Sequence, residues 1–183
     1  MVDSGWVRVE LPTRPVIGIL HPGVMGAAVG SALKPVAGAV IWAAAGRSIT
    51  TSKRAELADL VGVPDLAELA RRADLIISLC PPRAALDVAE RVAAALDGRR
   101  QRPLYLDANT VSPATVREIG VLLGEGAVVD GVIVGPPAWE PGRTVLWLAG
   151  AGAPVVAGLF GGSPFEVRVV GAEVGAAALA AGP

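Results

Sequence analysis

Short apolar runs that alternate with charged segments are the feature that most limits how this chain of 183 residues can fold. Most of the runs are rich in Val, Ile or Leu and show no polar alternation, which is typical of strands buried on both faces of a parallel sheet. The expected strands are Val16–Leu20, Ala39–Ala43, Leu75–Leu79, Leu104–Leu106, Val128–Val134, Val145–Leu148 and Val167–Val170.

The segments between these runs carry charges at helical spacing, and Ser112 followed by Pro113 is a helix start signal. Repeated strand, helix, strand order predicts the α/β class, with a doubly wound, mostly parallel sheet and flanking helices. We expect a loose leader over residues 1–14, one domain over 15–171 and a tail or helix start over 172–183. The expected helices are Ser52–Leu60, Asp65–Arg72, Arg83–Leu96 and Pro113–Leu123.

Composition excludes several classes of protein. Hydrophobic residues make up 52% of the chain and charged residues 18%, which is typical of a well-buried globular fold. A net charge of -1 offers no footprint for nucleic acid or an anionic membrane. The single cysteine, Cys80, excludes an intrachain disulfide, and with one histidine no Cys/His zinc site can form. We therefore expect a cytoplasmic protein.

An uncharged stretch lies between Arg143 and Glu166, but glycines and prolines interrupt it. We interpret it as a strand, a short helix and a turn, and expect no membrane span.

A glycine turn follows the first expected strand and opens the next helix. Such a turn lets the backbone approach a pyrophosphate, whose charge then meets the amide donors of the helix N-terminus. Gly23 and Gly26 fit the second and third glycines of the dinucleotide fingerprint, whereas His21 stands where the first is expected. The alternative is a turn with close helix packing and no ligand. The expected contacts are Leu20, His21, Pro22, Gly23, Val24, Met25 and Gly26.

The end of the second strand bears on the choice of cofactor. An NAD-binding chain usually places Asp or Glu there for the ribose 2′-hydroxyl, and this chain has Arg47 and Ser48 instead. Because the planar guanidinium matches a phosphate, Arg47 favours NADP, with NAD still possible. The alternative is a solvated loop charge.

Five segments together resemble the motifs of the β-hydroxyacid dehydrogenase superfamily, in the same order along the chain. This group includes 6-phosphogluconate and 3-hydroxyisobutyrate dehydrogenases, and the pattern is most similar to a poorly characterised bacterial branch. The resemblance implies a Rossmann-type NAD(P)-binding domain and oxidoreductase chemistry. The segments are Leu20–Gly26, Arg47–Ser48, Ser78–Pro82, Asp107–Pro113 and Val129–Pro137.

The resemblance also implies roles for single residues. Cys80, Pro81 and Pro82 would lie along the cofactor, with Cys80 packing rather than reacting, and Asn109 would lie near the nicotinamide. For the substrate, the family positions correspond to Thr110, Val134 and Gly135. Val134 replaces a serine, which removes a hydroxyl donor for a substrate carboxylate.

The family's catalytic lysine corresponds to a position near Ala181, and the helical domain that follows it in the family is missing here. The resemblance places the opening of the interdomain helix over Gly171–Ala178. We therefore expect no catalytic residue in this chain.

Three hypotheses remain open at this point. The chain is the NADP(H)-binding domain of an oxidoreductase that moves hydride between nicotinamide and a small hydroxy acid or imine-like substrate, or it is a stand-alone dinucleotide-binding module without activity. The third is a scaffold that binds no nucleotide. Two oligomeric states are open: a monomer, or a homodimer that pairs through exposed apolar surface.

Overall fold

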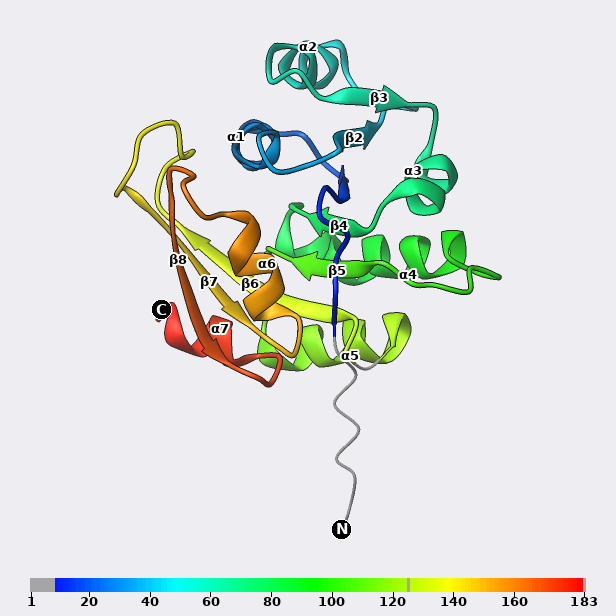
Figure 1. Cartoon of the computed structure of the whole chain (residues 1–183). Helices are drawn as coiled ribbons and strands as arrows, with labels where there is room; N and C mark the ends of the chain where they lie inside the picture. Colours follow the sequence, from blue (N-terminus) through cyan, green and yellow to red (C-terminus); the bar gives the residue numbers. More distant parts are fainter. Residues whose placement is uncertain (1–8, 125, 183) are drawn as a thin grey trace.

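The computed structural model describes residues 9–124 and 126–182, and within these ranges eight strands form one sheet (Figure 1). The strand order is β3-β2-β1-β4-β5-β6-β7-β8. Strands β1 to β6 pair in parallel with their neighbours, β7 runs antiparallel to β6, and β8 is parallel to β7. The predicted α/β class and mostly parallel sheet are confirmed. The strands are β1 (Val16–Ile19), β2 (Ala39–Ala43), β3 (Val61–Val63), β4 (Leu75–Ser78), β5 (Leu104–Asp107), β6 (Val128–Val134), β7 (Thr144–Ala149) and β8 (Phe165–Gly171).

Helices cover both faces of the sheet (Figure 1). Helices α1, α2 and α6 contribute to the core on one face, and α3, α4 and α5 to the core on the other. The helices are α1 (Val24–Leu33), α2 (Ile49–Leu57), α3 (Leu66–Arg72), α4 (Ala85–Ala95), α5 (Pro113–Leu123), α6 (Ala153–Leu159) and α7 (Ala176–Ala180), with a 3₁₀ turn η1 (Pro82–Ala84) before α4.

Burial on both faces explains why the strands are continuous apolar runs. Ile76 and Ile77 of β4 are fully buried, yet they belong to the two different core clusters, because successive side chains of a strand point to opposite faces. Helix α5 begins as predicted, with the Ser112 hydroxyl accepting a hydrogen bond from the Thr115 amide at 3.2 Å.

One strand was not predicted. β3 has three residues, of which Val61 and Gly62 are exposed, so it leaves no apolar run in the sequence. The preceding helix was predicted over Ser52–Leu60, but α2 begins earlier, at Ile49, and ends at Leu57. Ser48 determines this start because its side chain caps the helix, and Leu60 packs into the core beyond the helix end.

The C-terminal part differs from the expected opening of a helix at Gly171. β8 continues through Gly171, and α7 begins only at Ala176. The buried Asp130 carboxylate of β6 accepts hydrogen bonds from the Gly175 and Ala177 amides at 2.8 and 3.0 Å. Ala177 is fully buried against β6 and β7, so α7 packs on the sheet.

The expected leader over residues 1–14 is described only from Val9 onward. Val9 and Leu11 pack against the core, and the Arg14 guanidinium donates to the Ala37 carbonyl at 2.7 Å. These contacts tie residues 9–14 to the domain.

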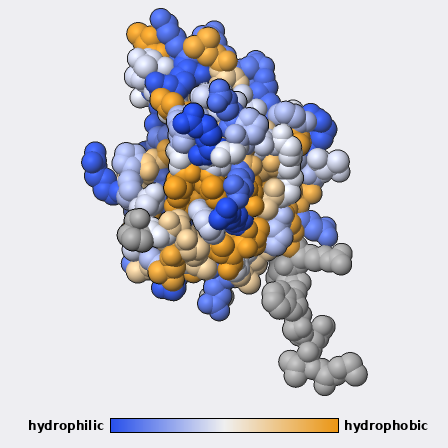
Figure 2. All heavy atoms as spheres, turned by 90° about the vertical axis from the view of Figure 1, so that its left-hand side faces the viewer, coloured by the Kyte–Doolittle hydropathy of each residue, from blue (hydrophilic) through white to orange (hydrophobic). Residues whose placement is uncertain are grey.

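One face carries clustered apolar side chains, interrupted by charged ones (Figure 2). It is the side on which β8 and α7 lie, and Val169 and Leu179 are exposed on these two elements. The homodimer remains a prediction for this face. In the part of the chain that the structure describes, no helix combines the length and apolar character needed to cross a bilayer.

Candidate functional site

The predicted motifs converge on one edge of the sheet. Parallel strands present their carboxyl ends at the same edge, and the motifs follow β1, β2, β4, β5 and β6. Strands β1 and β4 are neighbours although two strands separate them in the chain, and the Leu20 amide donates to the Ile77 carbonyl at 3.0 Å. This is the topological switch point, where open α/β sheets have their ligand crevice.

At this switch point the glycine turn brings α1 against β1. A Cβ at Gly26 would meet the His21 carbonyl oxygen at 2.2 Å, so the close approach requires glycine. Gly23 differs, because a Cβ there would meet nothing within 4 Å. It is also the N-cap of α1 and provides no side-chain hydrogen bond to the first turn. The turn therefore leaves an uncapped helix N-terminus beside open space, an arrangement that suits an anion.

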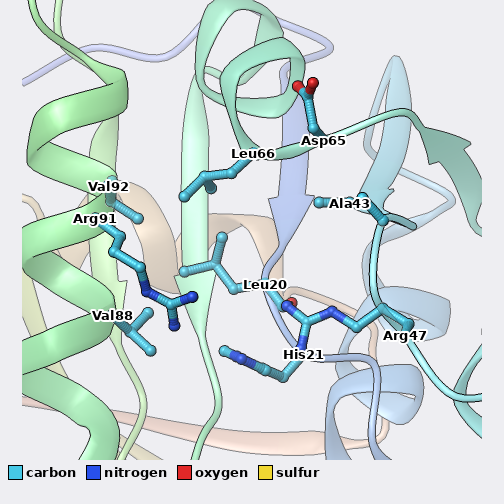
Figure 3. Close-up of a pocket in the computed structure, with 10 residues that line it drawn as sticks. Leu20, His21, Ala43, Arg47, Asp65, Leu66, Val88, Arg91 and Val92 are labelled. Atoms are coloured by element: carbon cyan, nitrogen blue, oxygen red, sulfur yellow. The ribbon is translucent and has the colours of Figure 1, made fainter.

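A pocket of about 220 Å³ opens beside this turn. Figure 3 shows His21 and Arg47 reaching into it from the turns after β1 and β2, while Arg91 reaches in from α4 on the opposite side. The pocket is lined by Leu20, His21, Ala43, Ala45, Arg47, Asp65, Leu66, Val88, Arg91 and Val92. Its walls thus combine apolar side chains with three basic ones.

The electrostatics of the pocket favour an anion. Burial, together with the charges of Arg47 and then Arg91, lowers the pKa of His21 to about 4, so the imidazole is neutral at pH 7. Burial and the charge of Arg91 also lower the pKa of the Arg47 guanidinium. Within the described residues, His21 Nδ1 and Arg47 Nε are buried without a hydrogen-bond partner. Arg47 is positioned by its Nη2, which donates to the Leu20 carbonyl at 3.1 Å.

Two carboxylates lie near the pocket, one capping a helix and the other in an exposed ion pair with Arg91. Asp65 is the N-cap of α3, and its Oδ1 accepts from the Glu68 amide at 2.9 Å. Figure 3 shows its carboxylate pointing away from the basic side chains. Asp87 lies one turn before Arg91 on α4, 3.5 Å from its Nε, in a pair that is mostly exposed. Such exposed ion pairs contribute little free energy, so Arg91 remains available to a ligand.

Ser48 does not join Arg47 in the pocket. Its hydroxyl accepts from the Thr51 amide at 3.2 Å and lies 3.0 Å from the Thr51 hydroxyl. The phosphate contact expected of Ser48 stays a prediction, and the structure adds that this side chain caps the first turn of α2.

Asn109 is 3% exposed and binds the protein itself. Its Oδ1 accepts from the Cys80 amide at 2.6 Å, and its Nδ2 donates to the Ser78 hydroxyl at 3.1 Å. The side chain therefore links the ends of β4 and β5 instead of facing open crevice. Burial raises the pKa of the Cys80 thiol, which agrees with the packing role predicted for it.

Asp107, next to this network, is fully buried. Its Oδ1 accepts from the Asn109 amide at 2.9 Å, and its Oδ2 has no hydrogen-bond partner among the described residues. Burial is the main reason that its pKa rises to about 6.

The remaining predicted residues lie along the same edge, outside the arginine-lined pocket. Pro81, Pro82 and Thr110 are exposed in the turns after β4 and β5. Val134 ends β6 with 47% of its surface exposed, and Gly135 follows at φ 130. The chain there packs so closely that a Cβ on Gly135 would meet the Arg143 carbonyl oxygen at 2.4 Å.

Around the glycine turn, Pro22 is buried and Val24 is half-exposed on the first turn of α1, while Met25 packs against the core. Ala181, the position corresponding to the family lysine, is the C-cap of α7.

Arg91 is the functional candidate that the sequence did not reveal. It lies within a helix that was predicted, but no local motif distinguishes it from other helix-surface arginines. Only the packing of α4 beside the ends of β1 and β2 brings it to Arg47.

Comparisons with known proteins agree with this architecture. No known family profile matches the sequence. An uncharacterized 28.5 kDa protein from Methanothermus fervidus is 34% identical over 90 residues, which is 49% of this chain and 34% of that protein. The conserved protein MTH1747 of unknown function, reported as structurally similar to 3-hydroxyacid dehydrogenases, matches with TM-score 0.76 and 26% identity. That match covers 89% of this chain and 60% of the other.

Two solved enzymes share the fold. A Mycobacterium tuberculosis 3-hydroxyisobutyrate dehydrogenase matches with TM-score 0.71 and 20% identity, covering 92% of this chain and 58% of that one. A reductive aminase from Aspergillus terreus, solved with NADPH and ethyl levulinate, matches with TM-score 0.70 and 18% identity, covering 92% of this chain and 59% of that one. An imine reductase in this group was solved with NAD⁺.

The chain thus has the Rossmann-like fold of the NAD(P)-binding domains of 3-hydroxyacid dehydrogenase-like proteins, as its motifs predicted. It spans about a third of the length of the curated relative and about 60% of the first matched structure.

Proposed function

We infer that this chain binds a nicotinamide dinucleotide, with NADP(H) preferred over NAD(H). The observation that carries the proposal is the uncapped N-terminus of α1 at Gly23, with open space beside it at the switch point. Backbone amides and the helix dipole would meet the pyrophosphate there. Gly26 supports the same assignment because it lets α1 approach β1 closely enough to present those amides.

The adjoining pocket suits the adenosine half of the dinucleotide. Leu66, Val88 and Val92 offer apolar wall, and Arg47 with its buried, unpartnered Nε suits a 2′-phosphate. Matched proteins of the same fold were solved with NADPH or NAD⁺, which supports a nicotinamide cofactor. When bound, such a cofactor supplies a hydride donor or acceptor, and the protein orients it.

Titration of the chain with NADPH and NADH, followed by the fluorescence of the reduced nicotinamide, tests the proposal. We expect saturable binding of both, with NADPH about tenfold tighter, a difference of about 1.4 kcal/mol. Equal affinity would remove the argument from Arg47. No binding of either would contradict the cofactor assignment and favour the scaffold hypothesis.

We propose binding without turnover by these residues. The sequence has two lysines, and neither serves the carboxyl edge: Lys34 forms an ion pair with Asp59, and Lys53 is exposed on α2. When the protein is added to NADPH and small keto acids or imine precursors, we expect no protein-dependent oxidation of NADPH. Oxidation in proportion to protein concentration would instead favour a complete hydride-transfer enzyme. We also place the protein in the cytoplasm, consistent with the single free cysteine, Cys80.

A further inference from the structure

We propose that Arg91 of α4 is a specificity-determining residue that, together with Arg47, clamps the 2′-phosphate of NADP(H) from the opposite side of the pocket. The proposal rests on the function inferred above and extends it to a residue that no sequence motif singles out. The ligand group it concerns is a phosphomonoester carried on the ribose of an adenosine.

The two arginines lie on opposite sides of one pocket. Arg47 follows β2 and Arg91 belongs to α4, and both line the same pocket, facing each other across it (Figure 3). Two guanidinium groups repel each other in a partly buried site; burial and then the charge of Arg91 lower the pKa of Arg47. A dianion bound between them would turn that repulsion into two charge-assisted contacts.

The neutral imidazole of His21 and the nearby carboxylates leave the charges of the two arginines largely uncompensated. His21 lies between the arginines with its Nδ1 buried and unpartnered. Asp65 lines the pocket but caps α3, and Asp87 holds Arg91 only by an exposed contact at 3.5 Å. The described lining therefore has no carboxylate positioned to neutralise both arginines, and a phosphate would supply the missing charge.

The Arg47 side chain is fixed at one point. It donates through Nη2 to the Leu20 carbonyl at 3.1 Å, which leaves Nη1 for a ligand. Arg91 is held less firmly, on a helix whose inner residues Val88 and Val92 are buried in the core. The helix is thus a rigid base for a side chain that can close on a ligand.

Arg91→Gln in the otherwise intact chain tests the proposal, with NADPH and NADH titrated against both proteins. We expect the Kd for NADPH to rise about tenfold and the Kd for NADH to stay within about twofold. Arg117→Gln on α5 is the matched control, because Arg117 is an exposed helix arginine that does not line the pocket. It should leave both affinities unchanged.

Adenosine 2′,5′-bisphosphate and 5′-AMP serve as second probes, because they differ by the 2′-phosphate alone. Arg91→Gln should weaken the first and spare the second. Equal weakening of NADPH and NADH would overturn the proposal, because Arg91 would then contact the part common to both ligands, for instance by stacking on the adenine. Unchanged NADPH affinity would overturn it too, while leaving the proposed function intact. Failure of the wild-type chain to bind either dinucleotide is the separate result that refutes the proposed function.

Discussion

Asn109 Oδ1 accepts a hydrogen bond from the Cys80 backbone amide at 2.6 Å and so joins the turn after β5 to the turn after β4. The same side chain donates to the Ser78 hydroxyl, and almost none of it is exposed. Its first role is therefore to hold in place the segment that leads into Pro81 and Pro82.

Asn109→Ala should destabilise the fold. The substitution leaves the Cys80 amide and the Ser78 hydroxyl without their partner, which costs about 1 to 3 kcal/mol in the free energy of unfolding. Thr110→Ala, at the exposed neighbouring position, should change it by less than about 0.5 kcal/mol. Urea denaturation of the three proteins measures both values. Equal stability of Asn109→Ala and wild type would show that the network does not hold these turns.

The two glycines of the turn should respond differently to alanine. At Gly26 a methyl group would meet the His21 carbonyl oxygen at 2.2 Å, so Gly26→Ala should lower the unfolding free energy by about 2 kcal/mol or more. At Gly23 there is space and φ is -67, so Gly23→Ala should cost less than about 1 kcal/mol.

Gly23→Ala should nevertheless weaken NADPH binding at least about tenfold, because its methyl group occupies the space proposed for the pyrophosphate. Thermal denaturation and NADPH titration on the same samples separate the two effects. If Gly23→Ala binds NADPH as tightly as wild type, the pyrophosphate does not lie at this turn.

Dinucleotide binding should be linked to protonation of His21. Its pKa of about 4 reflects burial and the charges of Arg47 and Arg91. Asp65 is the acidic side chain on the wall of the same pocket. A bound phosphate offsets the arginine charges, so the pKa of His21 rises in the complex and binding takes up protons as the pH falls.

His21→Asn is the variant that isolates this linkage. The ratio of wild-type to variant affinity for adenosine 2′,5′-bisphosphate should increase as the pH is lowered from 8 to 6, since protonation of the ligand affects both proteins equally. Calorimetry in two buffers of different ionisation enthalpy reports the proton uptake directly. A ratio that is flat across this range would mean that the phosphate does not lie near the imidazole.

Asp107 should make the stability of the chain depend on pH. Burial raises its pKa from 3.8 to about 6 in the folded protein, so the folded state holds the proton more tightly than the unfolded one. The resulting stabilisation is complete below pH 3.8 and is lost as the pH rises through 6. The shift corresponds to about 3 kcal/mol.

Asp107→Asn keeps an oxygen acceptor for the Asn109 amide and removes the titration. Relative to wild type, this variant should gain about 2 to 3 kcal/mol of unfolding free energy between pH 4 and pH 7. Urea titrations at both pH values give the difference, and Asp65→Asn, at an exposed helix cap, is the control substitution. An unchanged difference would mean that Asp107 titrates normally.

Much of the fold could be predicted from local patterns. The runs at β1, β2, β4, β5 and β6 were recognisable because these strands are buried on both faces, and the start of α5 because its cap is local. β3 was missed because an edge strand of three residues, mostly exposed, needs no apolar run. The antiparallel direction of β7 leaves no mark on its composition, since direction depends on the connection and not on which faces are buried.

The candidate site, like the fold, could be predicted only in part from local patterns. The glycine turn and Arg47 were identified from the sequence because a helix N-terminus and a strand end are properties of neighbouring residues. The ligand contacts expected of Ser48 and Asn109 stay predictions, and the structure adds that both side chains accept hydrogen bonds from nearby backbone amides.

Local sequence patterns were enough to predict the alternation of elements, the close approach at Gly26 and the lack of a carboxylate after β2. Packing between distant segments places Arg91 of α4 opposite Arg47, puts the half-buried His21 between them, and removes Asp107 from contact with water. Electrostatic energies depend on the distance between charged groups and on the dielectric surroundings. Here both depend on the packing of segments that are far apart in the chain.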